Sequence, residues 1–157
     1  DKPKLVMFSS GGMKDSATFA IESGEFVCNF ATEQLAEALN RSSAPAPRGT
    51  SEFSFSGLTE APCRLVSAPR VAESPAALEC RVTEWFHPRD IDGGHSGNVV
   101  VIGQVVGIHL DDALIREGRI DMALAAPLSR LGYMDYAVTR DVFEMFRPRA
   151  PDASDLD

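Results

Sequence analysis

The sequence has few basic residues and no long uninterrupted apolar run. Its 157 residues include 15 Lys and Arg against 23 Asp and Glu, which gives a formal net charge of −8. Nucleic acids and anionic membranes recruit basic surfaces, so this balance disfavours both as partners. The most apolar segment, residues 99–110, contains glycine, glutamine and histidine. It is shorter than the roughly 20 residues that cross a bilayer and indicates a buried strand instead.

Cysteine is also scarce. The three cysteines, Cys28, Cys63 and Cys80, are far apart and show none of the CxxC or Cys/His spacings typical of zinc sites. Two of them lie in the strand-like apolar segments FVCNF and LECRV. We interpret all three as structural free thiols, which fits a protein of the reducing cytoplasm.

Recognisable catalytic motifs are missing as well. The chain has no GxSxG nucleophile motif. The segment 87–95 carries two histidines and two aspartates: His87, Asp90, Asp92 and His95. Its spacing departs from that of an EF-hand, because Gly93 follows the second aspartate directly and Val101 stands where the closing glutamate belongs. We therefore predict a hairpin loop here, with no metal site and no catalytic acid–base pair.

Apolar alternation and glycine or proline breaks predict the elements that are present. Helices are expected over residues 16–24, 33–40 and 111–118, with single helical turns near 51–56 and 121–125. Strands are expected over residues 4–10, 25–30, 63–71, 76–86 and 98–110, with extended chain again at 136–139. The last two long strands should form a hairpin. Together these elements predict one mainly β domain over residues 1–147, a barrel with short peripheral helices, and a polar, disordered tail over 148–157.

The segment FSSGGMKDS, residues 8–16, is the most suggestive polar motif. Adjacent glycines allow successive backbone N–H groups to point toward one anion. Lys14 adds a positive charge, and a helix begins directly afterwards. The hydroxyl donors are Ser9, Ser10 and Ser16. The spacing matches neither a Walker A loop nor GxGxxG, so from spacing alone a structural turn is the simpler interpretation and a phosphate site the alternative.

Several motifs together resemble the flavin reductase-like, FMN-binding split-barrel proteins. In chain order they are VMFSSGGMKDS, GEFVCNFATEQLAEALN, PRVAESPAALECRV, VVVIGQVVGIHLDDALIREGRID and PLSRLGYMDYA. The resemblance implies a Greek-key split β-barrel that forms a homodimer, with FMN near the subunit interface. It also implies that the turn after the first strand holds the FMN phosphate. The residues carried over to this role are Ser9, Ser10, Lys14, Asp15 and Ser16, with Asp15 shaping the turn.

Two departures accompany this resemblance. Family members usually begin further upstream, with strands and a loop rich in Ser, Phe and Asn that contacts the isoalloxazine ring, so we expect that such a segment is missing from this chain. Well-studied reductases also carry Gly-Asp-His before the long strand, and Asn98 stands where the histidine aligns. Asn98 is therefore expected to donate a hydrogen bond near the flavin ring. The resemblance supports flavin binding more directly than nicotinamide use.

The segment PLSRLGYMDYA resembles a family segment that commonly reads RLGG, two residues and tyrosine. Tyr133 replaces the second glycine. Arg130 and Tyr136 are then candidates for contacts near the pocket or the dimer interface. The alternative is a surface arginine and a core aromatic.

The resemblance leads to three hypotheses about function. The first is a cytoplasmic oxidoreductase that passes electrons from NAD(P)H through bound FMN to free flavin or a partner redox protein. The cofactor carries this chemistry, so no catalytic residue is assigned. The second is a non-catalytic FMN-binding electron carrier, and the third is a truncated, cofactor-free member of the family.

Overall fold

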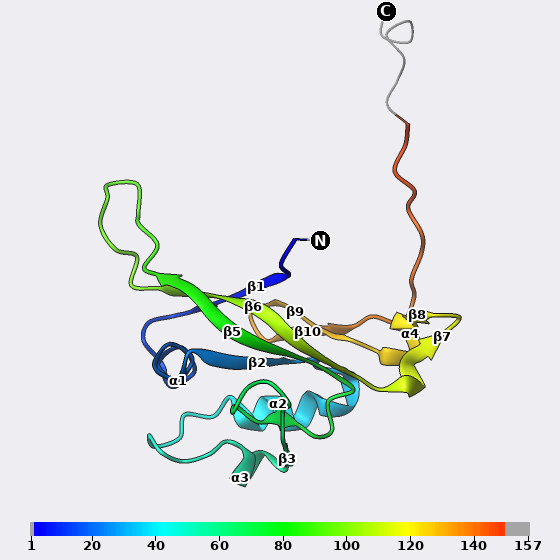
Figure 1. Ribbon diagram of the computed structural model, residues 1–157, viewed down its shortest axis with the longest axis horizontal. Helices are drawn as coiled ribbons and strands as arrows, with labels where there is room; N and C mark the ends of the chain where they lie inside the picture. The colour runs from blue at the N-terminus through cyan, green and yellow to red at the C-terminus, as the bar shows by residue number, and fades with distance from the viewer. Residues whose placement is uncertain (1, 150–157) are drawn as a thin grey trace, which may run out of the picture.

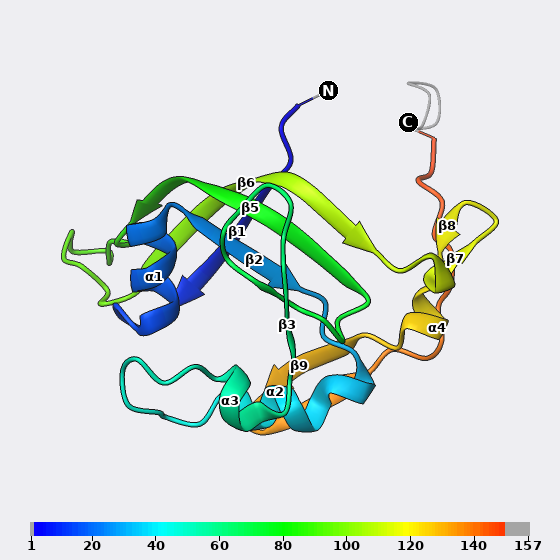
Figure 2. The same cartoon turned by 60° about the horizontal axis from the view of Figure 1, so that its bottom comes forward.

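The computed structural model describes residues 2–149 and shows a mainly β molecule with short helices around it, as the sequence predicts (Figure 1). At its centre is a curled four-stranded antiparallel sheet in the order β1-β6-β5-β2 (Figure 2). The strands are β1 (Leu5–Ser10), β2 (Glu25–Asn29), β5 (Ala76–Phe86) and β6 (Val99–Leu110). Because β1 and β2 lie at the two edges, the long β5–β6 hairpin forms the middle of the sheet.

The β5–β6 hairpin forms because two long runs of apolar and β-branched residues flank the glycine-containing loop 87–98. Its register shifts twice, between Glu79 and Cys80 and between Val82 and Glu84. Each shift is a β-bulge or similar irregularity, which bends the strand and increases its local twist. The bulges therefore help the hairpin to curl.

The core lies between α1 (Asp15–Ser23) and the sheet. Four buried side chains meet there: Ala17, Ala20, Val99 and Val101. Phe8 and Phe26 pack against them edge to face, with ring centroids 5.2 Å apart. The helix ends at Gly24, whose φ of 72° is the left-handed conformation that terminates helices. Small alanines let the helix approach the sheet closely, so the start of α1 is fixed relative to β1 and β6.

Shorter elements surround the sheet. One group consists of η1 (Glu33–Leu35), α2 (Ala36–Ser42), α3 (Phe53–Ser56), β3 (Glu60–Ala61) and β4 (Arg70–Val71). After β6 come η2 (Asp112–Leu114), β7 (Ile115–Arg116), β8 (Arg119–Ile120), α4 (Met122–Ala125), β9 (Leu128–Gly132) and β10 (Asp135–Val138). From β10 the chain extends away from the sheet (Figure 1). Over residues 2–149, no helix is long and apolar enough to cross a bilayer.

Two predicted elements are wrong. Residues 63–71 do not form a long strand, because the N–H groups of residues 64–66 donate to the Glu79 side chain instead of to a neighbouring strand; only β4 is extended there. Residues 111–118 do not form a helix. The Asp111 carboxylate caps the short 3₁₀ turn η2, and the chain then continues as the β7–β8 pair. The tail predicted over residues 148–157 lies mostly outside the described residues.

Candidate functional site

The turn after β1 lies beside the start of β6. In the antiparallel register Ser10 pairs with Val99, so the end of one strand meets the beginning of the other. Two backbone hydrogen bonds of 2.9 Å close the turn: the Gly12 N–H donates to the Ser10 carbonyl, and the Lys14 N–H donates to the Gly12 carbonyl. Gly12 has a φ of 97°, which residues with side chains rarely adopt. The turn therefore depends on glycine at this position.

Helix α1 begins directly after this turn without a side-chain cap. Lys14 is the N-cap residue, and its ammonium group cannot accept a hydrogen bond from the first N–H groups of the helix. Asp15 and Ser16 form the first turn, where Asp15 is half-buried while Ser16 and Lys14 are exposed. An anion at this point would accept the unpaired N–H groups and would meet the positive end of the helix dipole.

Asn98 lies in the same region, at the end of the loop that leads into β6. It directly precedes Val99, the residue that pairs with Ser10. The Asn98 carbonyl oxygen lies 3.0 Å from Nδ1 of His87, and the Asn98 N–H donates to the Ser96 hydroxyl at 3.3 Å. These contacts fix the backbone of Asn98, while its side chain is exposed and can meet a ligand.

The structure thus brings all six predicted binding residues to one end of the sheet. They are Ser9 and Ser10 at the end of β1, Lys14 before α1, Asp15 and Ser16 in the first turn of α1, and Asn98 directly before the paired strand β6. Together with the start of α1 they offer backbone N–H, hydroxyl, amide and ammonium donors. A phosphate monoester accepts hydrogen bonds from such a set, so anion binding is the chemistry that this arrangement supports.

A second cluster, which the sequence analysis missed, surrounds Glu79 in β5. Glu79 is 1% exposed, and its carboxylate accepts the N–H groups of residues 64, 65 and 66 at 3.0, 2.6 and 3.1 Å. Nε2 of His109, on β6, lies 2.5 Å from the same carboxylate. The available signal was the single acidic residue inside the apolar segment AALEC, because a buried charge requires partners.

These hydrogen bonds keep Glu79 ionised. Burial would raise its pKa, but the N–H groups of Arg64 and Leu65 and the His109 ring outweigh burial and lower the pKa to about 2. Cys63 offers a further possible ligand atom, and the three ligand atoms lie within 4.8 Å of one another. Burial, with the Glu79 charge, raises the pKa of the Cys63 thiol, whereas metals bind the thiolate. The Glu79 carboxylate already accepts four donors, so the cluster is better suited to hydrogen bonding than to holding a metal.

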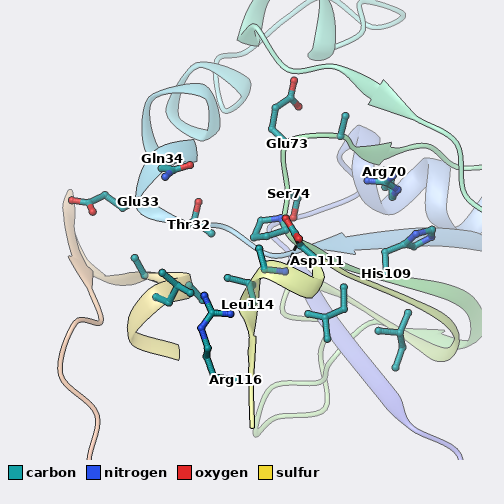
Figure 3. A pocket seen from close by; sticks show the side chains of 18 of the residues that line it. Thr32, Glu33, Gln34, Arg70, Glu73, Ser74, His109, Asp111, Leu114 and Arg116 are labelled. Atoms are coloured by element: carbon teal, nitrogen blue, oxygen red, sulfur yellow. Dashed lines mark hydrogen bonds between the residues drawn. The ribbon is translucent and has the colours of Figure 1, made fainter. Parts of the chain in front are cut away.

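A cavity of about 770 Å³ lies next to this cluster, at the end of β6 remote from the turn after β1. Figure 3 shows Arg70 and His109 on one side of the cavity and Arg116 on another. Arg64 also contributes to the wall, and Leu114 of η2 is part of its apolar lining. We call this feature the arginine cavity, because Arg64, Arg70 and Arg116 line it.

Most of the chain is similar to known proteins. A sequence profile of the flavin reductase like domain matches residues 1–136. The chain belongs to the flavin reductase-like family. An uncharacterized protein from Halalkalibacterium halodurans is 41% identical over 152 residues, which cover 94% of this chain and 72% of the relative. The family inferred from the sequence motifs is therefore confirmed.

Solved structures confirm the fold of this flavin reductase-like chain. Component B of nitrilotriacetate monooxygenase from Bacillus cereus is 30% identical and superimposes with a TM-score of 0.82, over 90% of this chain and 71% of that one. A split-barrel domain protein from Shewanella frigidimarina gives a TM-score of 0.77 at 23% identity, over 93% of this chain and 72% of that one. The predicted split-barrel fold is thus correct. Family membership supports flavin binding and a flavin-related oxidoreductase function.

The C-terminal motif of the flavin reductase-like chain forms the β9–β10 pair. Arg130 donates to the Tyr136 hydroxyl at 2.7 Å, and its guanidinium carbon lies 4.9 Å from the centroid of the tyrosine ring. Arg130 also donates to the carbonyl of Tyr133. Tyr136 is 42% exposed, so the interpretation as a core aromatic is wrong. Its contact with a pocket or a subunit interface stays a prediction.

Proposed function

We propose that this chain is an FMN-binding oxidoreductase that passes electrons from NAD(P)H through bound FMN to free flavin or to a partner acceptor. Membership of the flavin reductase-like family supports the flavin. The observation that carries the proposal is the uncapped start of α1, which follows a glycine turn and has Lys14 at its N-cap. The similarity to component B of a monooxygenase supports a partner oxygenase as one acceptor.

The residues of the turn fit the phosphate of FMN. Ser9 and Ser10 end β1 and Ser16 lies in the first turn of α1, so all three lie close in the chain to the unpaired helix N–H groups. Lys14 adds an ammonium group, which would donate a charge-assisted hydrogen bond to the phosphate. Asp15 is half-buried and shapes the turn rather than contacting the anion. The donors of the turn are therefore of the kind that binds a phosphate dianion.

In this proposal FMN supplies the electron-transfer chemistry, and the protein binds and orients it. Lys14 and the start of α1 hold the phosphate as a fixed anchor. Asn98 approaches from the start of β6 and donates its amide N–H toward the flavin ring. Because α1 packs on the sheet through Ala17 and Ala20, the anchor is held rigidly relative to the strand that carries Asn98.

Replacement of Lys14 by alanine tests the anchor. We expect FMN binding to weaken by about 1–3 kcal/mol, because a charge-assisted hydrogen bond is lost. Quenching of flavin fluorescence on titration with protein measures the affinity. Lys2→Ala removes an exposed lysine before β1 and should leave the affinity unchanged. An unaltered affinity of Lys14→Ala for FMN would show that residues 8–16 form an ordinary turn without a role in phosphate binding.

The electron donor is tested separately from the flavin. The FMN-loaded protein should oxidise NADH or NADPH, as followed by the loss of nicotinamide absorbance. Oxidation of neither nucleotide by a protein that does bind FMN would refute the reductase part of the proposal. It would leave the flavin-binding part standing.

A non-catalytic electron carrier is the second candidate function, and Asn98 favours it. An amide does not exchange a proton near neutral pH as an imidazole does, so Asn98 cannot replace the histidine of well-studied reductases in that role. A carrier would be reduced rapidly by a reduced redox protein and not by NAD(P)H. Stopped-flow reduction of bound FMN by the two kinds of donor distinguishes the carrier from the reductase.

A further inference from the structure

The arginine cavity lies at the opposite end of β6 from the proposed phosphate turn. β6 begins beside Ser10 and ends at Leu110, which lines the cavity. A strand rises about 3.3 Å per residue, so a strand of this length keeps the two regions well apart in one chain. The cavity is therefore a separate site from the turn that we assign to FMN.

The acidic residues of the cavity wall already have partners. Glu33 forms an ion pair with Arg140 at 2.5 Å. The Glu73 carboxylate accepts the Thr59 N–H at 3.0 and 3.1 Å. Asp111 caps η2 by accepting an N–H at 2.9 Å. Each of these carboxylates thus has at least one donor within the protein, and Glu33 has a cationic partner.

Within residues 2–149, two arginines of the wall, Arg64 and Arg70, have no such partners. Nε of Arg70 is buried without a hydrogen-bond partner among residues 2–149. No ion pair in this part of the chain includes Arg64 or Arg70. Arg70 is held in β4, whose Val71 N–H donates to Asn29 of β2 at 2.9 Å. A partly buried guanidinium without an acceptor is unfavourable, and an anion in the cavity would offset this cost.

His109 presents a further polar edge to the cavity. The Glu79 carboxylate is ionised and can only accept, so Nε2 of His109 carries the proton between them. This contact fixes the orientation of the ring and leaves Nδ1 for other partners. The His109 side chain is 21% exposed and lines the cavity together with Arg70 (Figure 3).

Polar groups supply more of the exposed lining of the cavity than apolar groups do, but one part of the wall is apolar. It includes Ile108, Leu110, Leu114, Leu124 and Ala125. The volume falls within the range of roughly 300–1,000 Å³ that is typical of small-molecule sites. A ligand with one charged end and an apolar body would satisfy both kinds of lining.

We propose that the arginine cavity binds a small organic anion, a carboxylate or a phosphate monoester with an apolar body, whose charged group contacts Arg70 and Arg64 beside His109. The two unpaired guanidinium groups provide the charge, and the Leu114 side of the cavity receives the apolar body. This anion site does not require FMN, so a test of it is independent of the proposed function.

Calorimetric titration with three matched probes tests the proposal. Benzoate, phenyl phosphate and uncharged benzyl alcohol are titrated into the Lys14→Ala variant, in which the anion site at the turn is weakened. Saturable binding of benzoate or phenyl phosphate, with none of benzyl alcohol, supports the proposal and shows which anion is preferred. Absence of saturable binding of both anions would overturn it.

Substitutions locate the binding. Arg70→Gln, added to Lys14→Ala, should weaken the affinity for the preferred anion by about tenfold or more, and Arg70→Lys should weaken it less. Arg89→Gln changes an exposed arginine of the loop 87–98 and should have no effect. Equal anion affinity in Arg70→Gln and its parent would place the ligand elsewhere and overturn the proposal.

If the Arg70 variants do not fold, NMR of a protein that keeps Arg70 tests the same proposal. The ring ¹⁵N resonances of His109, assigned by comparison with His109→Gln, should shift on titration with the bound anion. Those of His87 and His95, in the distant hairpin loop, should not. Unmoved His109 resonances at saturation would overturn the proposal.

Discussion

At the scale of single residues, Glu79 shows how one buried charge organises several parts of the chain. Its carboxylate holds residues 64–66 on one side and His109 on the other. It thereby connects an irregular segment to the central hairpin and orients one wall of the arginine cavity. A buried carboxylate of this kind stabilises the fold when all of these donors bond to it, and it destabilises the fold when some of them are left without an acceptor.

Replacing Glu79 with glutamine should lower the free energy of unfolding by about 2–4 kcal/mol. An amide cannot accept all four donors, and its own NH₂ group faces N–H groups of the chain. Urea unfolding at neutral pH measures the loss. Glu84→Gln changes an exposed glutamate of the same strand and should stay within about 0.5 kcal/mol of the wild type. Equal stability of the two variants would contradict this role for Glu79.

The free energy of unfolding should also depend on pH, because the Glu79 carboxylate stabilises the fold only while it is ionised. The pKa of Glu79 is about 2 in the folded protein, below the ordinary value of about 4.3 that we expect for the unfolded chain. As the pH falls, the unfolded chain therefore takes up the proton first. The stabilisation is complete above about pH 4.3 and is lost as the pH falls toward 2. Over this window the wild type should lose more stability than Glu79→Gln, and parallel profiles would refute the assignment.

At the scale of elements, the sequence predicts those helices and strands whose conformation depends on residues nearby in the chain. The β5–β6 hairpin and helix α1 follow from apolar alternation, glycine positions and a turn-rich loop, and they form close to where the sequence places them. The segment 63–71 has an equally strand-like composition, yet the carboxylate of Glu79 binds its backbone N–H groups. That partner lies well beyond the segment in sequence, so the apolar pattern of the segment does not reveal it.

Part of the candidate functional residues could likewise be predicted from the sequence, and part could not. The turn after β1 could be found because its glycines, serines and lysine are consecutive and precede a helix. The Glu79–His109 pair and the arginine cavity combine residues from β4, the two long strands and η2. The register of the β5–β6 hairpin and the packing of β4 and η2 beside it bring these residues together.

Gly103 tests the packing of the central hairpin. A Cβ atom at this position would lie 2.4 Å from the Phe26 ring and 3.2 Å from the Arg81 carbonyl oxygen. Gly103→Ala should therefore destabilise the fold by about 1–3 kcal/mol through overpacking. Gln104→Ala changes an exposed neighbour in the same strand and should cost much less. Urea denaturation compares them, and an equally stable Gly103→Ala would show that Phe26 can move without loss.

At the scale of the whole molecule, many apolar side chains are exposed, and two groups of them lie on the edge strand β1 and beyond β10. Leu5 and Met7 on the edge strand β1 are 56% and 72% exposed. Beyond β10 the exposed apolar side chains are Val142, Phe143, Met145 and Phe146. Exposed apolar patches and open sheet edges mark interaction surfaces. We propose that these surfaces are covered in the homodimer that the family resemblance implies.

The homodimer predicts that Phe143→Ser combined with Phe146→Ser weakens self-association. Both rings are more than 80% exposed in one chain, and their burial in a dimer would be lost, which should raise the dimer dissociation constant about tenfold or more. Sedimentation equilibrium measures the constant. Ile91→Ser makes a similar apolar-to-polar change in the loop 87–98 and should have no effect. A wild type that is monomeric at micromolar concentration would contradict the proposal.

The comparison of FMN with riboflavin tests the central claim most directly, because the two ligands share the flavin ring and differ in the phosphate. If the turn after β1 holds that phosphate, equilibrium dialysis should show FMN binding about tenfold or more tightly than riboflavin. Lys14→Ala should reduce this preference while affecting riboflavin little. Equal affinity of the wild-type protein for FMN and riboflavin would show that the turn does not bind the phosphate.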